Sequence, residues 1–482
     1  MTNGSLKSTA TRGMLWNALE KLSVQGSQLI IGIVLARILM PEDFGLIGML
    51  SIFIVVSQVF VSSGMGSGLI QKKNRSEIDY STVFVFNFAV SSSFYILLFF
   101  VAPLIANFYN MPQLVILTRV LAINIVINSL AIVQRTRLII NIDFKTIAKV
   151  NVVSVIAGGL FGVTFAYLGF GVWALVVQNL VRATVSVIMF WLLSKWKFSL
   201  SFSKQSFKEL FGFGYKLLLT GLYGQILQNV YKLIIGKAFS AAELGFYTQA
   251  KNFAELASGT VSSVLQQVTY PILASLQDDR KRMISVFSRM IRMTAFLSFP
   301  AMTMLALLAD PFIRLVLTEK WLPAVPLLQW MSFARIFYPI SALNLNILNA
   351  NGRSDLYLKV DASKIPLIIT ALIVTVPFGV KAMVIGQVVT SAIAFFINGY
   401  MPGKLFGYGP LSQLKDMIPV FIATAITALV VFVVNSFIEI LIIKLIAGVL
   451  IGIIVYLSSS YVLKIKELKE VRIIFQSILN KK

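Results

Sequence analysis

Apolar runs about as long as a membrane is thick recur along this chain from Leu15 to Leu463, with short polar breaks between them. A helix that crosses a bilayer needs roughly 20 mostly apolar residues, so each run is long enough to span. The composition agrees, because 57% of the residues are hydrophobic and 13% are charged, whereas about a quarter are charged in a soluble domain. The sequence therefore predicts an all-α polytopic membrane protein. No polar stretch approaches the roughly 50 residues of a small soluble domain, which excludes a soluble catalytic domain.

The runs resolve into fourteen predicted transmembrane helices. They cover residues 14–38, 44–69, 80–106, 114–134, 147–167, 172–193, 211–236, 245–272, 290–312, 325–349, 362–379, 382–402, 418–436 and 440–463. The N-terminus is polar through Lys7 and Arg12 and then enters a long amphipathic stretch without a small-residue cleavage site. We therefore expect a retained first span rather than a signal peptide.

The formal net charge of +23 is concentrated in alternate connections between these spans. The basic connections hold Lys72, Lys73, Arg75, Arg135, Arg137, Lys145, Lys149, Lys195, Lys197, Lys204, Lys208, Arg280, Lys281, Arg282, Arg289, Arg353, Lys359, Lys404 and Lys415, and the tail from Lys464 to Lys482 is basic too. Such loops face the cytoplasm by the positive-inside rule. The charge asymmetry predicts a multi-pass membrane protein with both termini cytoplasmic, and it explains the basic balance without a nucleic-acid partner.

The residue inventory excludes several kinds of chemistry. The chain has no cysteine and no histidine, which excludes disulfides, thiol nucleophiles, Ser–His–Asp triads and zinc sites. Nothing resembles the Gly-x-x-x-x-Gly-Lys-Ser/Thr loop that cradles nucleotide phosphates. We therefore expect no enzymatic activity, no cofactor and no metal.

The chain repeats itself in several places, always in the same order. The first match has the same spacing in both copies: Lys21, Gln25, Gln28 and Gly32 correspond to Gln225, Asn229, Lys232 and Gly236. Next, the segment 41–45 resembles 242–245. Two further sets match in the same order: Ser51, Gln58 and Ser62 with Lys251, Ser258 and Ser262, and Arg119, Asn128 and Arg137 with Arg335, Asn344 and Arg353. Internal repeats of this kind indicate duplicated structural units. They predict two halves of six helices each.

The predicted layout has four parts: an N-terminal six-helix lobe over 1–205, a C-terminal six-helix lobe over 206–405, two additional transmembrane helices in 406–463, and a basic amphipathic tail over 464–482. We expect the tail to lie on the anionic cytoplasmic leaflet. Because six is even, both lobes insert with the same orientation, as in parallel-repeat transporters. Two such lobes leave a central cavity and can rock to open it on either side, which is the architecture of a carrier.

Charges inside the spans mark the candidate site, since each costs roughly 2.5–3.5 kcal/mol at mid-bilayer and must be sheltered. They are Glu20, Lys21, Arg119, Arg182, Lys216, Lys232, Lys251, Glu255, Asp310 and Arg335. Snorkelling near a helix end accounts for Arg119, Lys216 and Asp310. Lys232, Lys251 and Glu255 continue polar stripes, because residues at i, i+4 and i+7 share a helix face. The candidate substrate-binding residues on these stripes are Lys21, Gln25, Gln28, Gln225, Asn229, Lys232, Lys251 and Arg335.

Two carboxylates on the central stripes, Glu20 and Glu255, are the candidate ion-coupling residues. A carboxylate in apolar surroundings can exchange a proton or bind Na⁺. The alternative is a structural ion pair. Lys251 and Glu255 are four residues apart and can pair within one helix, and Glu20 lies beside Lys21.

Two segments resemble a known family. Residues 32–45, Gly-Ile-Val-Leu-Ala-Arg-Ile-Leu-Met-Pro-Glu-Asp-Phe-Gly, resemble the opening of bacterial polysaccharide flippases of the multidrug/oligosaccharidyl-lipid/polysaccharide exporter (MOP) superfamily, and Asn-Ala-Asn-Gly-Arg at 349–353 is similar to another stretch of that family. The resemblance implies a flippase that moves undecaprenyl-pyrophosphate-linked oligosaccharide across the cytoplasmic membrane by alternating access, for exopolysaccharide, lipopolysaccharide O-antigen or capsule synthesis. The family has no catalytic motif to transfer.

A substrate of this kind fits the stripes. Lys21, Lys232 and Lys251 are expected to converge on the pyrophosphate, because a phosphate is attracted strongly in a low-dielectric cleft, and the side-chain amides suit sugar hydroxyls. The implied partners are the lipid-linked oligosaccharide, membrane lipids and the polysaccharide polymerase machinery. Two alternatives stay open. A cation-coupled multidrug antiporter of the same fold needs acidic residues in its cavity, and a membrane scaffold for polymerisation would move no substrate.

Overall fold

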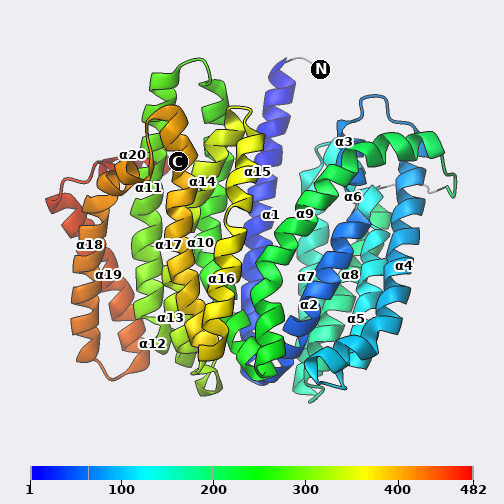
Figure 1. Cartoon of the computed structure of the whole chain (residues 1–482), viewed down its shortest axis with the longest axis horizontal. Coiled ribbons are helices and arrows are strands. Elements are labelled where there is room, and N and C mark those ends of the chain that lie inside the picture. The colour runs from blue at the N-terminus through cyan, green and yellow to red at the C-terminus, as the bar shows by residue number, and fades with distance from the viewer. Residues whose placement is uncertain (1–2, 63, 195, 197–198, 480–482) are drawn as a thin grey trace. The chain divides into compact units, whose positions relative to one another are not determined.

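The computed structural model describes residues 3–62, 64–194, 196 and 199–479, and these form helices joined by short connections, with no strand among them (Figure 1). The all-α prediction is confirmed. Eleven helical segments within the described residues are long and apolar enough to cross a membrane: Leu19–Ile38, Pro41–Gln71, Glu77–Tyr109, Leu114–Ile140, Phe144–Tyr167, Val172–Ser194, Arg280–Leu307, Ser354–Phe378, Val380–Phe406, Pro410–Ser436 and Leu441–Val462. The protein is therefore a multi-pass membrane protein.

Three predicted spans lie outside those eleven segments. Two of them fall in α9 (Lys204–Ala238) and α10 (Ala241–Ser275), which have 35 residues each and carry the polar stripes that lower their hydropathy. The third is divided between α13 (Ala324–Arg335) and α14 (Tyr338–Ala350). Helices of 12 and 13 residues reach about 20 Å at 1.5 Å per residue, short of a 30 Å hydrocarbon core. The count of fourteen stays a prediction.

Contacts divide the chain into two compact units, Met1–Gly245 and Phe246–Lys482. The first unit contains α1 (Asn3–Ile38), α2 (Pro41–Ser62), α3 (Met65–Gln71), α4 (Glu77–Tyr109), α5 (Leu114–Ser129), α6 (Ile132–Ile140), α7 (Phe144–Tyr167), α8 (Val172–Ser194) and α9. Helix α9 follows the predicted boundary at residue 205, yet it packs on α2, α3 and α4. The boundary between the two compact units, after Gly245, therefore lies one helix later than the lobe boundary predicted after residue 205.

Glycines let the helices of the first unit approach closely. In Figure 1, α4, α5, α7 and α8 run alongside one another. A Cβ on Gly158 of α7 would lie 2.7 Å from the Gln178 carbonyl oxygen and 2.8 Å from the Arg182 Cβ. A Cβ on Gly162 would lie 2.8 Å from the Gln178 Cβ. The close approach of α7 and α8 brings Arg182 against the backbone of α7, and α1 packs on the same helix.

The starts of α2 and α10 cross backbone to backbone in the first unit. A Cβ on Gly45 would lie 1.7 Å from the carbonyl oxygen of Ala241, and a Cβ on Gly245 would lie 2.0 Å from that of Pro41. The two contacts are reciprocal, since each glycine meets the first residue of the other helix. Only glycine leaves room for this crossing.

Two pairs of helix ends are separated by the same number of residues along the chain. Helix α1 ends at Ile38 and α9 at Ala238, 200 residues apart, and the starts of α2 and α10 have the same separation. A separation of 200 residues places Gln25 opposite Gln225, whereas the predicted repeat places Lys21 there, four residues earlier, and the repeat stays a prediction. Four residues are about one helical turn. A shift of one turn keeps the same face, so spacing within the helix does not distinguish the two alignments.

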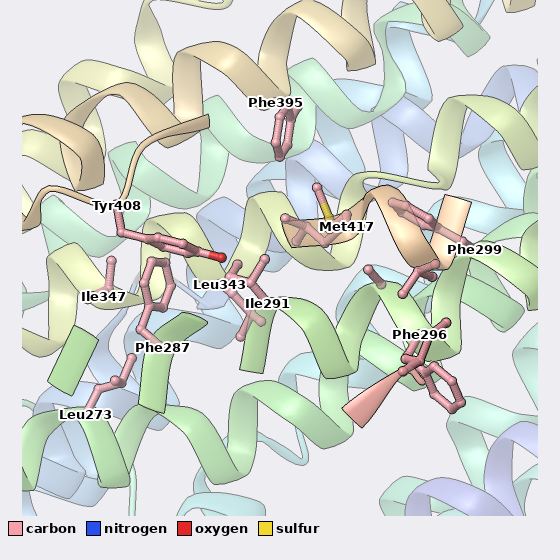
Figure 2. Close-up of a cluster of buried hydrophobic side chains, with 14 of the residues drawn as sticks. Leu273, Phe287, Ile291, Phe296, Phe299, Leu343, Ile347, Phe395, Tyr408 and Met417 are labelled. Atoms are coloured by element: carbon pink, nitrogen blue, oxygen red, sulfur yellow. The ribbon is translucent and has the colours of Figure 1, made fainter. Parts of the chain in front are cut away.

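The second unit continues α10 and contains α11 (Arg280–Leu307), α12 (Ala309–Val316), α13, α14, α15 (Ser354–Ala362), α16 (Ile365–Thr375), α17 (Val380–Phe406), α18 (Pro410–Ser436), α19 (Leu441–Val462) and α20 (Lys466–Leu479), with single 3₁₀ turns at Glu319–Trp321 and Val376–Phe378. Its core surrounds α11, where Phe287 and Phe299 are fully buried (Figure 2). Leu343 of α14, Phe395 of α17 and Met417 of α18 pack into the same cluster. This core joins helices that are more than a hundred residues apart.

The tail helix α20 is held by ion pairs. Glu467, which is buried, accepts from Arg292 of α11 at 2.7 Å, and Glu470 pairs with Arg289 at 2.6 Å. Arg292 also reaches Asp416 of α18, at 3.2 Å. The acidic residues of the tail thus face α11, and Lys464, Lys466 and Lys469 are exposed. Contact of these lysines with the anionic leaflet stays a prediction, and residues 480–482 of the predicted tail lie outside the described part.

Candidate functional site

A polar cavity of about 880 Å³ lies within the first unit. Helices α2, α3, α5, α6, α7 and α8 contribute its polar lining, and α9 contributes Leu217, Leu218 and Gly221. The polar residues that line it are Gln58, Ser62, Ser67, Asn124, Asn128, Arg135, Thr136, Asn151, Ser154, Asn179, Arg182 and Ser186. This lining contains two guanidinium groups and no acidic side chain.

Helix periodicity brings these side chains together. Asn179 and Arg182 are three residues apart on α8, so they share a face of that helix. Asn124 and Asn128 are four apart on α5, and the Asn128 amide donates to the Asn124 side-chain oxygen at 2.8 Å. The cavity therefore has a wall of amides beside one arginine, in helices that are long enough to span a membrane.

Arg182 is held in place by the first helix. With its amide oxygen turned toward the guanidinium, Gln28 of α1 accepts hydrogen bonds from both terminal nitrogens of Arg182, at 2.6 and 3.1 Å. Hydrogen bonds to a charged group are stronger than those between neutral groups. The guanidinium is exposed to the cavity while its stem packs against α7. Gln28 is thus a candidate residue that the structure brings to the site.

Glu20 is the second contact of α1 with the cavity wall. Its carboxylate accepts a hydrogen bond from the Asn151 amide of α7 at 2.5 Å. Consecutive helix residues point in different directions, which explains why Glu20 faces α7 rather than the neighbouring Lys21. Lys21 and Gln25 are exposed.

The candidate residues of α9 lie apart from this cavity lining. Asn229 is buried and donates to the backbone oxygen of Gln225 at 2.9 Å. Lys232 is half-buried, one helical turn farther along. The convergence of Lys21, Lys232 and Lys251 stays a prediction.

The second unit holds a separate charged group. Lys251 and Glu255 pair along α10 at 3.7 Å between Nζ and Oε1, as their spacing predicts. The same carboxylate oxygen accepts from Arg335, the last residue of α13. The Arg335 guanidinium also lies over the Tyr338 ring, 5.0 Å from its centre. The structure therefore joins three candidate residues into one cluster, which we call the α10–α13 charge cluster.

Sequence reasoning missed most of the cavity lining. Arg182 stands among the charges inside predicted spans but received no role, and Asn124, Asn151 and Asn179 were not singled out. The available signal was an amide or guanidinium within three consecutive apolar segments, 114–134, 147–167 and 172–193. Within the described residues, no group of three His, Cys, Asp or Glu side chains is placed to hold a metal ion.

Another set of ion pairs surrounds Lys72, which lies in the connection between two membrane-spanning segments. Lys72, after α3, contacts Asp79 at 3.0 Å and Glu209 of α9 at 2.9 Å. Burial disfavours the charge on Lys72, but the hydrogen bonds to Glu209 and Asp79 outweigh it and raise the pKa of Lys72. Asp79 is buried and also closes a capping box with Ser76. These contacts join the start of α9 to the connection between α3 and α4.

Known proteins resemble most of the chain. Residues 34–326 match a family described as polysaccharide biosynthesis protein. The teichuronic acid biosynthesis protein TuaB of Bacillus subtilis is 26% identical, over 78% of this chain and 79% of TuaB. The lipopolysaccharide biosynthesis protein WzxC of Escherichia coli is 23% identical, over 82% of this chain and 81% of WzxC.

The fold matches that of a solved flippase. The lipid II flippase MurJ in an inward closed conformation superimposes with a TM-score of 0.78 and 18% identity, over 93% of this chain and 98% of MurJ. The resemblance seen in residues 32–45 and 349–353 is thereby confirmed. The chain belongs to the polysaccharide biosynthesis protein family, and it is a multi-pass membrane protein with the fold of this solved flippase.

Proposed function

We propose that this protein translocates undecaprenyl-pyrophosphate-linked oligosaccharide units across the cytoplasmic membrane by alternating access, for surface polysaccharide synthesis. One observation carries the proposal: the first unit has a polar cavity inside a bundle of membrane-spanning helices. Its volume, about 880 Å³, is at the upper end of the roughly 300–1,000 Å³ of small-molecule sites. Such a volume accommodates several sugar rings.

The lining chemistry favours an anionic saccharide over an organic cation. Asn, Gln and Ser side chains donate to and accept from sugar hydroxyls. Arg135 and Arg182 supply positive charge, and a guanidinium binds phosphate oxygens two at a time. A multidrug antiporter that binds cations needs acidic residues in its cavity, and the lining has none among the described residues.

The architecture that we propose has fourteen spans, two six-helix repeats over 1–205 and 206–405, and two additional helices before a cytoplasmic tail. Two observations support it. The starts of α2 and α10 cross reciprocally at Gly45 and Gly245, and the helices at 114–140 and 324–350 are both interrupted near their middles. Both termini are proposed to be cytoplasmic from the loop charges.

Within this proposal, Lys21, Lys232 and Lys251 attract the pyrophosphate, and the amides of Gln25, Gln28, Gln225 and Asn229 bind sugars. Arg335 acts with Lys251, to which it is linked through Glu255. Glu20 and Glu255 are the residues proposed to couple transport to a cation gradient. Substrate is proposed to pass on to the polymerase machinery on the periplasmic side.

Loss of surface polymer tests the proposal in cells. Cells without the protein are expected to lose the polymer and accumulate lipid-linked units on the cytoplasmic leaflet, and the wild type is expected to reverse both. At equal membrane abundance, Arg182→Ala is expected to restore about a tenth of the polymer or less. The matched control is Arg119→Ala, since Arg119 also lies in a span but packs over Phe99 at 4.2 Å instead of lining the cavity. Normal export by Arg182→Ala combined with Arg135→Ala would contradict the assignment, whereas resistance to cationic dyes without polymer export would favour the antiporter.

A further inference from the structure

Arg182 lies at the middle of its membrane-spanning helix. It is ten residues after Val172 and twelve before Ser194, the two ends of α8, so it lies about 15–18 Å from either end at 1.5 Å per residue. Because the hydrocarbon core is about 30 Å thick, this is the depth of the bilayer centre. Arg135, the other arginine of the cavity lining, is five residues from Ile140, the end of α6, and therefore only about 8 Å from that end.

The charge of Arg182 has no acidic partner among the described residues. Its guanidinium donates to Gln28 of α1, and the cavity lining holds no carboxylate. Helix α1 has one carboxylate, Glu20, which accepts from Asn151 and lies eight residues, or about 12 Å, from Gln28. A cation at mid-bilayer is costly without a compensating anion, so this position favours a ligand that brings one.

Gln28 leaves one edge of the guanidinium open. Its oxygen occupies the edge that the two terminal nitrogens form. The edge formed by Nε and a terminal nitrogen remains, and its two N–H groups match the two oxygens of a carboxylate. Asn179 and Ser186 lie one turn before and one turn after Arg182 on α8, line the same cavity and suit hydroxyl groups. A carboxylate surrounded by hydroxyl groups is the chemistry of an acidic sugar.

The diphosphate of a lipid-linked unit does not reach this depth while its polyprenyl chain stays among the lipid tails. A diphosphate joined to such a chain lies at the level of the headgroups, beyond the roughly 30 Å core. Arg135 is close to that level because it lies near the end of its helix. The sugars extend from the diphosphate into the cavity, so they are the part of the substrate that meets Arg182.

Resting on the function proposed above, we infer that the transported oligosaccharide contains a sugar that bears a carboxylate, and that Arg182 is the residue that selects it. Arg135 then serves the diphosphate at the edge of the cavity. A bidentate pair between Arg182 and the sugar carboxylate favours an acidic unit over the matching neutral unit by about tenfold or more in affinity.

The test measures the binding of three probes to the purified full-length protein in detergent: cellobiose, cellobiouronic acid and inorganic pyrophosphate. Titrations are followed by NMR, from the protons of the sugars and the phosphorus of pyrophosphate. The wild type is expected to bind cellobiouronic acid about tenfold or more tightly than cellobiose, and Arg182→Ala is expected to bind the two sugars equally. Pyrophosphate binding is expected to survive Arg182→Ala and to weaken about tenfold in Arg135→Ala.

The matched control is Arg119→Ala, because Arg119 also lies in a span but packs over Phe99 and does not line the cavity. It is expected to keep the preference of the wild type for the acidic sugar. Equal affinity of the wild type for the two sugars would overturn the inference. Loss of pyrophosphate binding in Arg182→Ala would overturn it too, since Arg182 would then serve the diphosphate.

Two further variants keep the inference testable if Arg182→Ala does not fold. Arg182→Gln keeps a polar side chain without the charge, and Arg182→Lys keeps the charge without the bidentate geometry. The preference for cellobiouronic acid is expected to disappear in the first and to fall by a smaller factor in the second, and an undiminished preference in Arg182→Gln would overturn the inference.

The inference and the proposed function fail separately. A preference for the acidic sugar that depends on Arg182, in a protein that moves no lipid-linked oligosaccharide in proteoliposomes, would support this site while refuting the proposed function. Transport by a wild-type protein that binds acidic and neutral sugars equally would do the reverse.

Discussion

Replacing Gly45 by alanine tests the crossing of the starts of α2 and α10. The added Cβ would lie 1.7 Å from the carbonyl oxygen of Ala241, whereas ordinary contact begins at 3.4 Å. The atom it meets belongs to the backbone, so no side-chain rotation relieves the overlap. The starts of α2 and α10 must therefore separate by more than 1 Å. Gly245→Ala creates the reciprocal overlap, 2.0 Å from the Pro41 oxygen.

The cost of this overlap follows from overpacking. Extra methylenes in a packed core typically cost about 1–3 kcal/mol, and occasionally more. We expect the upper end of that range here, since Leu46 and Met49 on the following turns are both buried and must move with the backbone. Gly32→Ala and Gly224→Ala are matched controls, because nothing lies within 4 Å of a Cβ at either position. Each is expected to be neutral or to gain up to about 1 kcal/mol of helix propensity.

Thermal unfolding in detergent and the quantity of protein in the membrane measure the effect. Gly45→Ala and Gly245→Ala are expected to lower the unfolding temperature by several degrees and to reduce polymer export. The two controls are expected to match the wild type in both assays. A wild-type unfolding temperature for Gly45→Ala, with normal export, would refute the crossing of the two helices.

Four further outcomes are expected. Arg182→Ala should reduce export about tenfold or more and Arg182→Lys less, because a hydrogen bond to a charged group is worth roughly 1.5–3 kcal/mol; equal export by both would refute the role. Lys232→Ala should abolish export at normal abundance while Lys232→Arg retains part of it, and full activity of the alanine variant would remove Lys232 from the site. Because the pKa of Lys72 is raised, its pairing stabilises the protein below the ordinary value of 10.5 and is lost as pH rises through the raised value; the unfolding temperatures of wild type and Lys72→Ala should converge above pH 10.5, and a constant difference would contradict this. Reporter fusions in the 275–289 loop should report cytoplasm and those near Trp321 periplasm, whereas the opposite pattern would invert the topology.

Local patterns predicted the helices of this protein well, and long-range packing explains what they missed. Hydropathy along the sequence identifies each apolar helix because a span depends only on its own residues. The Lys251–Glu255 pair was predicted for the same reason, since both residues belong to one turn. Arg335 joins that pair from 80 residues away, and no periodicity within α10 indicates which helix lies opposite.

The cavity illustrates the same limit. Arg182 is recognisable in the sequence as a charge within a span. Gln28, which accepts its hydrogen bonds, and Asn151, which lines the same cavity, come from other helices. Their meeting depends on Gly158, which brings α7 and α8 together.

Transport by the purified protein is the most direct measurement of the central claim. Lipid-linked oligosaccharide placed in one leaflet of proteoliposomes, with a lectin or glycosidase on the other side, reports the arrival of sugars. The account predicts that wild-type protein exposes the sugars at a rate well above that of protein-free vesicles, and that Arg182→Ala reduces this rate about tenfold or more. Equal rates in wild-type, Arg182→Ala and protein-free vesicles would contradict it.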